Sequence, residues 1–438
     1  MKLPKITPCK LMKKYDNYKN SGVDWLGEIP GHWEEKKFKH LFSEKKKTTN
    51  VNLPCGSISF GKVVYKDDEK IPESTKRSYQ VLSNGDFLIN PLNLNYDLVS
   101  LRIALSDKDV VVSSGYIILN NNLKLNKDYF KWLLHIFDVV YMKTLGSGVR
   151  QTLSFTHIAN CELVFPPLEE QNKMAEFLEN KTTKIDQAIA IKQNQIELLK
   201  ERRQILIHKA VTRGLDDNVK LKDSGVEWIG EIPEHWEVAK IKQCSEKISK
   251  GTTPSTEGRE ILHEGEIRFL KSENIFEGFI TEKPLFFIDK KTDFIMKRSS
   301  LKLNDVLFVI AGASLGKVAV LTNEFLPANT NQAVAFIRPN NKIQPYFLSN
   351  FLVSNTIKEL TWLEAVQSAQ PNLSMENLGN FPITLPSIEE QQEIVEFIET
   401  TTTKIATAIS LKEQEIEKLK EYKLSLIDGV VTGKVRVC

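Results

Sequence analysis

Cysteine is scarce in this sequence, and its five copies are scattered along the chain. No pair has the C-x-x-C spacing of a zinc ligand set, and none stands near a pair of histidines. The sequence therefore argues against a metal site, and we predict no metal-ligating residue. We expect reduced, structural thiols at all five positions, which are Cys9, Cys55, Cys161, Cys244 and Cys438.

Long hydrophobic runs are also missing. No stretch of about 18 uninterrupted apolar residues is present, which argues against a transmembrane helix. Residues 1–14 contain lysines but no apolar h-region, so a signal peptide is not indicated. With 41% hydrophobic and 26% charged residues among 438, the composition is that of a soluble globular protein of two or more domains. We expect a cytoplasmic protein with no membrane partner.

The excess of positive charge is small, +3 at pH 7, with a pI near 8.3. This lies below the imbalance that would by itself indicate nucleic-acid binding. Lysines gather within residues 36–39 and 45–47, where they could meet phosphates or form an ordinary solvated surface. Charge alone does not decide between these interpretations.

Catalytic signatures are absent as well. Residues 56–62 have the G-x-x-x-x-G-K spacing of a phosphate-binding loop, but Val63 stands where that motif needs a hydroxyl, and the following residues indicate a strand. Residues 312–317 are one residue shorter and are also followed by valine. The Phe-Pro-Pro-Leu segment at 165–168 lacks the amide or carboxylate, and the aromatic, of an amino-methyltransferase loop. No local catalytic triad or carboxylate pair is evident, so we predict a non-catalytic chain.

What the sequence does contain is a double internal repeat. Frame A, residues 19–39, recurs at 222–242 with 14 of 21 positions identical. Frame B, residues 165–212, recurs at 385–432 with 23 of 48 positions identical. The order along the chain is frame A, middle 1, frame B, frame A, middle 2, frame B.

The two middles, residues 40–150 and 243–370, differ from each other. They cannot be aligned by eye over most of their length, and middle 2 has 128 residues against 111. Equivalent places are thus filled by different surfaces, an arrangement suited to reading two different targets. Each middle is predicted to be mixed α/β with short strands. The expected strands are 87–89, 110–112 and 116–119 in the first middle, and 306–310, 318–321 and 333–337 in the second.

Near its start, frame B reads Pro-Pro-Leu-Glu-Glu-Gln from Pro166 and Pro-Ser-Ile-Glu-Glu-Gln from Pro386, and proline followed by acidic residues indicates a helix N-terminus. The helix that follows has a seam with spacings of three and four residues for about four heptads, and both copies share a polar interruption at Lys192 and Lys412. This predicts coiled-coil packing of two helices of about 35 residues, or roughly 50 Å each. The alternative is that each helix covers its own domain. The apolar seam residues are Leu178, Ile185, Ile189, Ile196, Leu199, Leu206, Ile398, Ile405, Ile409, Ile416, Leu419 and Leu426.

Frame A is rich in turn-forming residues and holds two tryptophans per copy. A turn at residues 27–30 is expected to pack Trp25 with Trp33, and its copy is expected to do the same in the second repeat. His32 and its copy His235 stand beside a tryptophan, with no acidic or nucleophilic partner suggested. We therefore predict a packing role for both histidines rather than a catalytic one.

Loops crowded with Gly, Ser, Thr, Asn, Gln and Lys join the strands of both middles, and such side chains can bond base edges and phosphates. The alternative is that they are ordinary turn residues. A Leu-Ser phrase lies between each middle and frame B, at 153–154 and 373–374, which suggests a shared role such as gripping the DNA backbone. The candidate DNA-contact residues are Lys62, Arg77, Ser147, Gly148, Arg150, Gln151, Lys250, Thr252, Thr253, Ser255, Lys271, Ser314, Lys317, Asn331, Gln370 and Asn372.

In their order, these motifs resemble those of the DNA-specificity subunits of type I restriction–modification enzymes. The set includes two copies of S-G-V-[DE]-W-[LI]-G-E-I-P-x-H-W and two of [PS]-[LI]-E-E-Q before a heptad helix. Gly251-Thr-Thr-Pro254, Asp305 before its strand, Gly312-x-x-x-Gly316-Lys317 and the Leu-Ser phrases complete it. The resemblance covers nearly the whole chain.

The resemblance implies an α+β fold with a pseudo-two-fold repeat, in which two mixed α/β target-recognition domains are joined by two long helices forming an antiparallel coiled coil. Each recognition domain would read half of a bipartite, asymmetric DNA site, and the coil would set the unread spacer. Two methyltransferase subunits carrying S-adenosylmethionine would dock on the helices, and restriction subunits, motor nucleases using ATP and Mg²⁺, would join them. This chain itself would hold no cofactor. The implied domains are 15–166 (first frame A and recognition domain), 167–212 (central helix), 213–386 (linker, second frame A and recognition domain) and 387–432 (distal helix).

Middle 1 departs from the family pattern because it lacks the Gly-Thr-Thr-Pro segment, which leaves open which of its loops touches bases. Two other classes of function also stay open. A coiled-coil scaffold that binds no DNA predicts middles without sequence-selective affinity. A nuclease or methyltransferase, disfavoured by the missing motifs, predicts activity of the purified chain alone.

Overall fold

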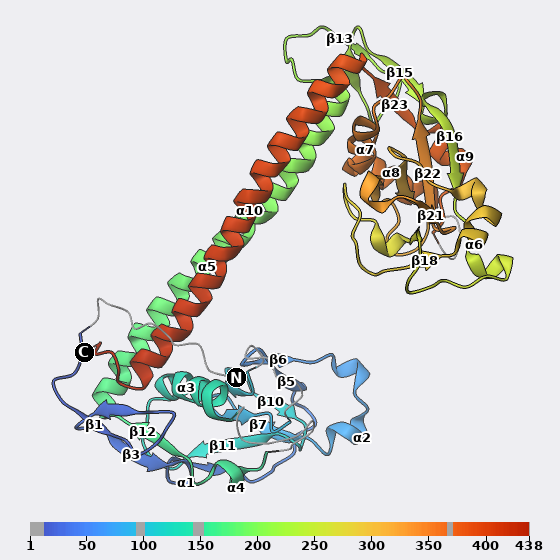
Figure 1. Cartoon of the computed structure of the whole chain (residues 1–438). Coiled ribbons are helices and arrows are strands. Elements are labelled where there is room, and N and C mark those ends of the chain that lie inside the picture. The colour runs from blue at the N-terminus through green and yellow to red at the C-terminus, as the bar shows by residue number, and fades with distance from the viewer. Residues whose placement is uncertain (1–12, 93–100, 143–152, 366–370, 438) are drawn as a thin grey trace. The chain divides into compact units, whose positions relative to one another are not determined.

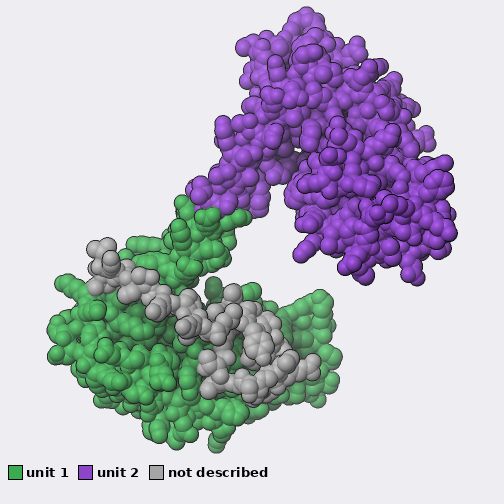
Figure 2. Space-filling view, in the orientation of Figure 1, with its two compact units in different colours: residues 1–193, 413–438 green, residues 194–412 purple. Residues whose placement is uncertain are grey.

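The chain folds into two compact units, each of which contains part of both long helices. In this computed structural model the described residues are 13–92, 101–142, 153–365 and 371–437. Unit 1 comprises residues 1–193 and 413–438, and unit 2 comprises residues 194–412 (Figure 2). Helices α5 (Leu168–Arg213) and α10 (Ile388–Val431) each contribute to both units. Within the described part of the chain, none of the helices combines the length and apolarity needed to cross a membrane.

Helices α5 and α10 pack against each other and run antiparallel (Figure 1). In unit 1, Nζ of Lys192 lies 2.6 Å from Glu415, and Nζ of Lys423 lies 2.7 Å from Asp186. Higher residue numbers in α10 therefore face lower numbers in α5. The predicted antiparallel pairing is confirmed.

The predicted seam faces inward in both helices. Its buried residues are Leu178, Ile185, Ile196, Ile398, Ile405, Ile416 and Leu426. Its half-buried residues are Ile189, Leu199, Leu206, Ile409 and Leu419. Away from the helix ends, the off-seam residues Ile191 and Leu411 are 59% and 55% exposed. In that stretch burial follows the spacing of three and four residues, because only the seam face of each helix meets its partner. Nearer the helix ends, the off-seam residues Ile207 and Ile427 are buried in the cores of units 2 and 1.

Each copy of frame A makes the same two strand pairings. A hairpin joins β1 (Tyr18–Asn20) to β2 (Glu28–Pro30), and its copy joins β13 (Leu221–Asp223) to β14 (Glu231–Pro233). The next strands, β3 (Glu34–Lys37) and β15 (Glu237–Lys240), pair with β12 (Glu162–Phe165) and β23 (Pro382–Leu385). Because β12 and β23 lead into α5 and α10, backbone hydrogen bonds fasten each frame A to the start of a long helix.

The two middles share one sheet topology, which their sequences do not reveal. The order is β4-β11-β8-β9 in unit 1 and β16-β22-β19-β20 in unit 2, and all neighbours are antiparallel. The strands of these sheets are β4 (Phe42–Glu44), β11 (Ile117–Asn121), β8 (Phe87–Ile89), β9 (Ile103–Leu105), β16 (Ser245–Lys250), β22 (Val334–Pro339), β19 (Val306–Val309) and β20 (Val318–Val320). The registers correspond as well: Phe87 lies opposite Leu119 and Leu105, as Val306 lies opposite Ile337 and Val320. The middles therefore share a four-stranded sheet and differ in the strands and loops around it.

The remaining strands distinguish the units. Unit 1 has two antiparallel pairs, β5 (Gly56–Ser59) with β6 (Lys62–Tyr65) and β7 (Gln80–Leu82) with β10 (Val110–Val112). Unit 2 has a three-stranded sheet of β18 (Phe287–Ile288), β17 (Ile267–Leu270) and β21 (Ala328–Thr330). The shorter helices are α1 (Phe38–Leu41), α2 (Glu73–Lys76), α3 (Lys127–Ile136), α4 (Phe155–Ile158), α6 (Lys290–Ile295), α7 (Pro345–Val353), α8 (Asn355–Ala365) and α9 (Met375–Asn380). The six strands expected from sequence are confirmed, with bounds that differ by at most two residues.

Candidate nucleic-acid interface

Glu170, in the first turn of α5, ties this helix to frame A. Its carboxylate accepts hydrogen bonds from Trp33 Nε1 and Tyr15 Oη, both at 3.0 Å, and lies 2.6 Å from Nε2 of His32. Burial raises the pKa of the Glu170 carboxyl, but the hydrogen bonds from His32, Trp33 and Tyr15 outweigh it and hold the pKa below its ordinary value. The second glutamate of the E-E-Q motif thus connects α5 to frame A, and we call this set of contacts the glutamate joint.

Glu390 repeats this joint in unit 2. Trp236 Nε1 donates to it at 3.2 Å, and Nε2 of His235 lies 2.7 Å away. The sequence suggested no acidic partner for His32 or His235, and the structure corrects this by supplying one in each unit. Both histidines serve the joint. Within the described ranges, no cluster of three or more His, Cys, Asp or Glu residues could hold a metal ion.

The tryptophans of frame A make ring contacts that differ from the expected pairing with each other. Trp25 packs against Phe137, with ring centroids 5.7 Å apart, and Trp33 packs edge-on against Tyr15 at 5.8 Å. The expectation of a Trp25–Trp33 pair is therefore not how these rings are used. Each tryptophan thus connects frame A to a different neighbour, Phe137 for Trp25 and Tyr15 for Trp33.

The glutamine of the E-E-Q motif connects each long helix to a helix of the neighbouring middle. The buried Gln171 accepts a hydrogen bond from the backbone N–H of Asn126, the N-cap of α3, at 2.9 Å. Gln391 does the same for Gln344, the N-cap of α7, at 2.8 Å. Each amide nitrogen also donates to the carbonyl oxygen of the proline five residues earlier. Motif and middle are thus locked together identically in both units.

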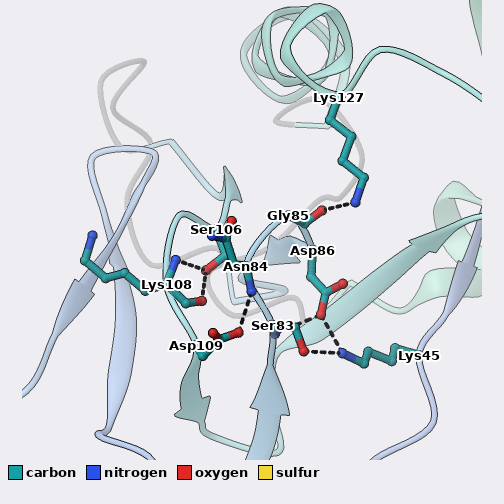
Figure 3. A network of polar contacts seen from close by, with 9 residues as sticks. All are labelled: Lys45, Ser83, Asn84, Gly85, Asp86, Ser106, Lys108, Asp109 and Lys127. Atoms are coloured by element: carbon teal, nitrogen blue, oxygen red, sulfur yellow. Dashed lines mark hydrogen bonds and ion pairs between the residues drawn. The ribbon is translucent and has the colours of Figure 1, made fainter.

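A polar turn precedes β8 in unit 1 and its counterpart β19 in unit 2. Figure 3 shows the turn of residues 83–86 in unit 1, where the backbone N–H of Ser83 donates to the Asp86 carboxylate at 2.9 Å. Two lysines from other segments hold it: Lys45 binds Asp86 and Lys127 donates to the Gly85 carbonyl, both at 2.6 Å. The turn therefore fixes the point at which β8 starts.

Asp305 occupies the same place before β19. The N–H of Lys302 donates to it at 2.7 Å, and Arg338 binds it through two nitrogens at 2.8 Å. Asn304, at φ +69°, stands where unit 1 has Gly85 at φ +84°. Burial raises the pKa of the Asp305 carboxyl above its ordinary value, although Arg338 opposes this. Asp305 is thus a buried structural residue, and the strand that it starts leads to the candidate loop at 312–317.

Four candidate DNA-contact residues, Lys250, Thr252, Thr253 and Asn331, lie together in unit 2. Gly251 presses on the loop after β21, where a Cβ atom would overlap the carbonyl oxygens of Thr330 and Asn331. The N–H of Thr252 donates to the Thr330 carbonyl at 3.2 Å. Asn331 carries a buried Oδ1 atom that has no hydrogen-bond partner. Only glycine allows this close approach, which brings two polar loops into one surface. Ser255, another candidate, is exposed in the short helical turn that follows.

A second group surrounds the loop at 312–317. A β-bridge from Ala311 to Asn372 places Asn372 at the start of this loop, and the Ser314 carbonyl accepts a hydrogen bond from the N–H of Lys317. Nζ of Lys317 lies 4.4 Å from the centre of the Phe276 ring. Lys271 makes the same kind of contact elsewhere, 3.9 Å above the ring of Phe286.

The candidates of unit 1 lie apart. Lys62 is exposed at the start of β6, and Arg77 is exposed after α2, where it pairs with Glu73 at 2.8 Å. Gly56 to Lys62 form a β-hairpin and residues 312–317 lead into β20, so neither glycine-lysine pattern precedes a helix. Five candidates, Ser147, Gly148, Arg150, Gln151 and Gln370, lie outside the described residues.

The Leu-Ser phrases have a shared structural role. Leu153 and Leu373 are buried, and their N–H groups donate to Pro91 and Ile310, the fifth residue counted from the start of β8 and β19, both at 2.9 Å. The serine that follows each leucine is the N-cap of α4 or α9. Each Leu-Ser phrase therefore connects a short helix, α4 or α9, to the segment at the end of β8 or β19.

Arg102, which is not among the candidate DNA-contact residues predicted from the sequence, is the unit 1 counterpart of Lys317. It directly precedes Ile103 of β9, the place that Lys317 holds before Val318 of β20. Its Nε donates to the buried Asp138 at 2.9 Å, while its Nη1 and Nη2 are buried and have no hydrogen-bond partner among the residues that the structure describes. The equivalence with Lys317 follows from strand register, and no local motif marks it.

Comparisons with known proteins agree with this architecture. The family model described as "Type I restriction modification DNA specificity domain" matches residues 30–201 and 233–421. The MjaVIII type I restriction enzyme specificity subunit of Methanocaldococcus jannaschii is 28% identical, covering 78% of this chain and 74% of its own. The putative MjaX specificity subunit of the same organism is 24% identical over 97% and 98%.

Two solved structures show the same fold. A chain from a study of complex assembly and conformational transition of a type I R-M system has a TM-score of 0.70 at 15% identity, covering 92% of this chain and 98% of that one. The HsdS subunit of Thermoanaerobacter tengcongensis has a TM-score of 0.52 at 17% identity, covering 93% and 98%. The doubled frame, the shared sheet topology and the two family matches together place this chain in the family of type I restriction–modification DNA specificity subunits.

Proposed function

We propose that this chain reads a bipartite, asymmetric DNA site for a type I restriction–modification complex. One observation carries the proposal: two units with the same sheet topology and the same helix joints bear different loops. A common framework would present two unlike surfaces to two unlike half-sites. The polar groups of Lys250, Thr252 and Asn331 are of the kind that bond base edges and phosphates.

The paired helices would serve as the ruler between the half-sites. Helix α5 has 46 residues, which corresponds to about 69 Å at roughly 1.5 Å per residue. In this proposal, residues 15–166 and 213–386 contain the recognition domains, and residues 167–212 and 387–432 are the spacer helices. The number of heptads would set the length of unread DNA.

The same proposal assigns catalysis and cofactors to other chains. Two methyltransferase subunits would bring S-adenosylmethionine, and motor-nuclease subunits would bring ATP and Mg²⁺, while this chain scaffolds them on DNA in the cytoplasm. Ile191 in unit 1 and Leu411 in unit 2 occupy equivalent positions of frame B and are exposed by 59% and 55%. Exposed apolar residues at one position of each repeat are candidate docking points for two copies of a partner.

A binding selection on random DNA, with the methyltransferase subunits present, tests the proposal. Recovery of two short motifs at a fixed separation is expected, and their absence would favour a scaffold that binds no DNA. Inserting one heptad into the 178–206 or the 398–426 stretch should change the separation and leave both motifs unchanged. Replacing middle 1 by that of a relative should change one motif only.

A further inference from the structure

Two equivalent cations of the frame B repeat bind different partners. Lys423 on α10 and Arg203 on α5 are separated by the repeat offset of 220 residues. In unit 1, Nζ of Lys423 lies 2.7 Å from both carboxylate oxygens of Asp186, across the coiled coil. The counterpart of Asp186 on α10 is Ala406, which offers no carboxylate. In unit 2, Nη2 of Arg203 reaches the second middle instead and lies 3.1 Å from Oε2 of Glu277.

Glu277 is held on a rigid hairpin tip. A β-bridge joins Ile275 to Ile280, and the N–H of Phe276 donates to the Phe279 carbonyl at 3.0 Å. The rings of Phe276 and Phe279 stack at 5.5 Å with an angle of 18° between their planes. Gly278, at φ +89°, closes the turn, and its N–H donates to Val318 of β20 at 2.9 Å. The carboxylate is therefore fixed relative to the main sheet of unit 2.

Three cations converge on this tip. Besides Arg203, Lys358 of α8 binds Oε1 of Glu277, and Lys317 lies over the ring of Phe276 at 4.4 Å. Burial raises the pKa of the Glu277 carboxyl, but the hydrogen bond from Lys358 and the charges of Lys358, Arg203 and Lys317 outweigh it and lower the pKa. Glu277 thus links helix α5, helix α8 and the loop that carries candidate DNA-contact residues.

The stability contributed by this network is expected to be small. The side chains of Arg203 and Glu277 are 32% and 43% exposed, and exposed ion pairs of this kind contribute little to folding. A pair on a rigid tip can nevertheless fix one orientation among several of similar energy. The function of the network is then geometrical, and a measurement of geometry is the one that detects it.

We propose that Glu277 is a positioning residue, which uses Arg203 and Lys358 to hold the second recognition domain at one angle to the spacer helix. This proposal rests on the proposed function, because the spacer gives the angle its meaning. Without the ion pairs of Glu277 with Arg203 and Lys358, which we call the latch, the complex would accept the unit 2 half-site at neighbouring separations from the other half-site. Among the described residues of unit 1, Lys423 is instead bound to Asp186 across the coil.

The test measures spacer tolerance of the full chain in complex with its methyltransferase subunits. Both half-sites are first defined by selection with the unaltered protein, and DNA with spacers up to two base pairs shorter or longer is then offered in competition. In E277Q and R203Q, spacers that differ by one base pair should gain about fivefold relative to the preferred one, the lower end of typical coupling effects. R203K keeps the positive charge that faces Glu277 and should retain more of the preference for the original spacer than R203Q does. K423Q is the matched control and should leave spacer preference unchanged.

Several results would overturn the proposal. Unchanged spacer tolerance in both E277Q and R203Q, with thermal stability retained, would show that the ion pair does not position the domain. A changed half-site motif would mean that Glu277 acts on base reading through the Lys317 loop. Equal loosening in K423Q would assign the effect to helix charge rather than to the latch. If the unaltered complex selects no bipartite site, the proposed function itself fails, and the latch fails with it.

Discussion

The two units fasten the starts of their long helices through the same histidine and tryptophan of frame A, and fasten the ends differently. At the starts, Glu170 and Glu390 bind frame A in the same way. At the ends, the carbonyl of Val431 on α10 accepts a hydrogen bond from Tyr129 Oη at 2.9 Å. The equivalent carbonyl of Val211 on α5 accepts one from Thr384 Oγ1 at 2.5 Å. The two donors come from different elements, α3 in unit 1 and β23 in unit 2.

The counterparts of these donors cannot make the bond. Tyr129 lies three residues after the N-cap of α3, and the residue three after the N-cap of α7 is Phe347. Thr384 corresponds to Val164 by the repeat offset. Unit 1 therefore has a hydroxyl at this place on its helix, Tyr129, and none on its strand. Unit 2 has a hydroxyl on its strand, Thr384, and none at that place on its helix. The structural demand is a donor for a buried carbonyl of the last helical turn, and either of two neighbouring elements can supply it.

The largest expected effect concerns Gly251, in the Gly-Thr-Thr-Pro segment of the second middle. In Gly251→Ala, the new Cβ would overlap the carbonyl oxygens of Thr330 and Asn331, and backbone must move. Overpacking of this kind should lower the free energy of unfolding by about 3 kcal/mol. Chemical denaturation would measure this, and binding should be lost at the unit 2 half-site alone.

Gly31→Ala in unit 1 is the control for this change. A Cβ there would meet Asn17 atoms at an ordinary 3.7 Å, and its φ is not positive. If both substitutions have equal effects, close approach at Gly251 is not what holds the two polar loops together.

Removal of the glutamate joints should have the next largest effect, and unit 1 should lose more. Glu170→Ala leaves three side-chain donors, Tyr15, His32 and Trp33, without an acceptor and should cost about 2–3 kcal/mol. Glu390→Ala leaves two side-chain donors without an acceptor, while the exposed N–H of Ser387, which also donates to Glu390, can bond water instead, so the cost should be about 1–2 kcal/mol. Denaturant unfolding of each variant gives the values. Glu169→Ala, whose side chain is 79% exposed, should change stability by less than about 0.5 kcal/mol. Equal losses in the two joints would mean that the Tyr15 hydrogen bond contributes nothing.

The long helices and their seam could be predicted from sequence, because heptad spacing is a local pattern and burial follows it directly. The glutamate joint could not, since Glu170 and His32 are 138 residues apart and neither motif names the other. The common sheet of the middles was missed for the same reason. Its strands are ordered by long-range pairing, and Arg102 and Lys317 correspond only through register. Loop composition predicted which types of residue could contact DNA. It did not predict that the loops at Gly251 and Asn331 meet, because their contact depends on the close approach that Gly251 allows.

Removal of either hydroxyl donor, Tyr129 or Thr384, should change the free energy of unfolding by about 1 kcal/mol. Tyr129→Phe and Thr384→Val each remove one hydrogen bond to a buried carbonyl and should each lower the free energy of unfolding by that amount. Thr384→Val combined with Phe347→Tyr transfers the unit 1 arrangement to unit 2 and should recover part of the loss. Hydrogen exchange at the last turns of α5 and α10 reports each end separately. No recovery in the double variant would show that α3 and α7 are not equivalent in their distance from the helix end.

Acid sensitivity should give the smallest difference between the units. The pKa values of Glu170 and Glu390 lie below their ordinary 4.5 in the folded chain, so each carboxylate contributes stability that is fully present above pH 4.5. That contribution is lost as the pH falls through the lowered pKa, because protonation removes the charge that the donors bind. Glu170→Gln cannot titrate, so the dependence of melting temperature on pH between 3 and 6 should be flatter than in the unaltered chain. Glu390→Gln should flatten it less, since Glu390 has fewer side-chain donors and a more exposed side chain, 33% against 18%. Parallel curves for all three proteins would mean that these joints do not contribute to acid unfolding.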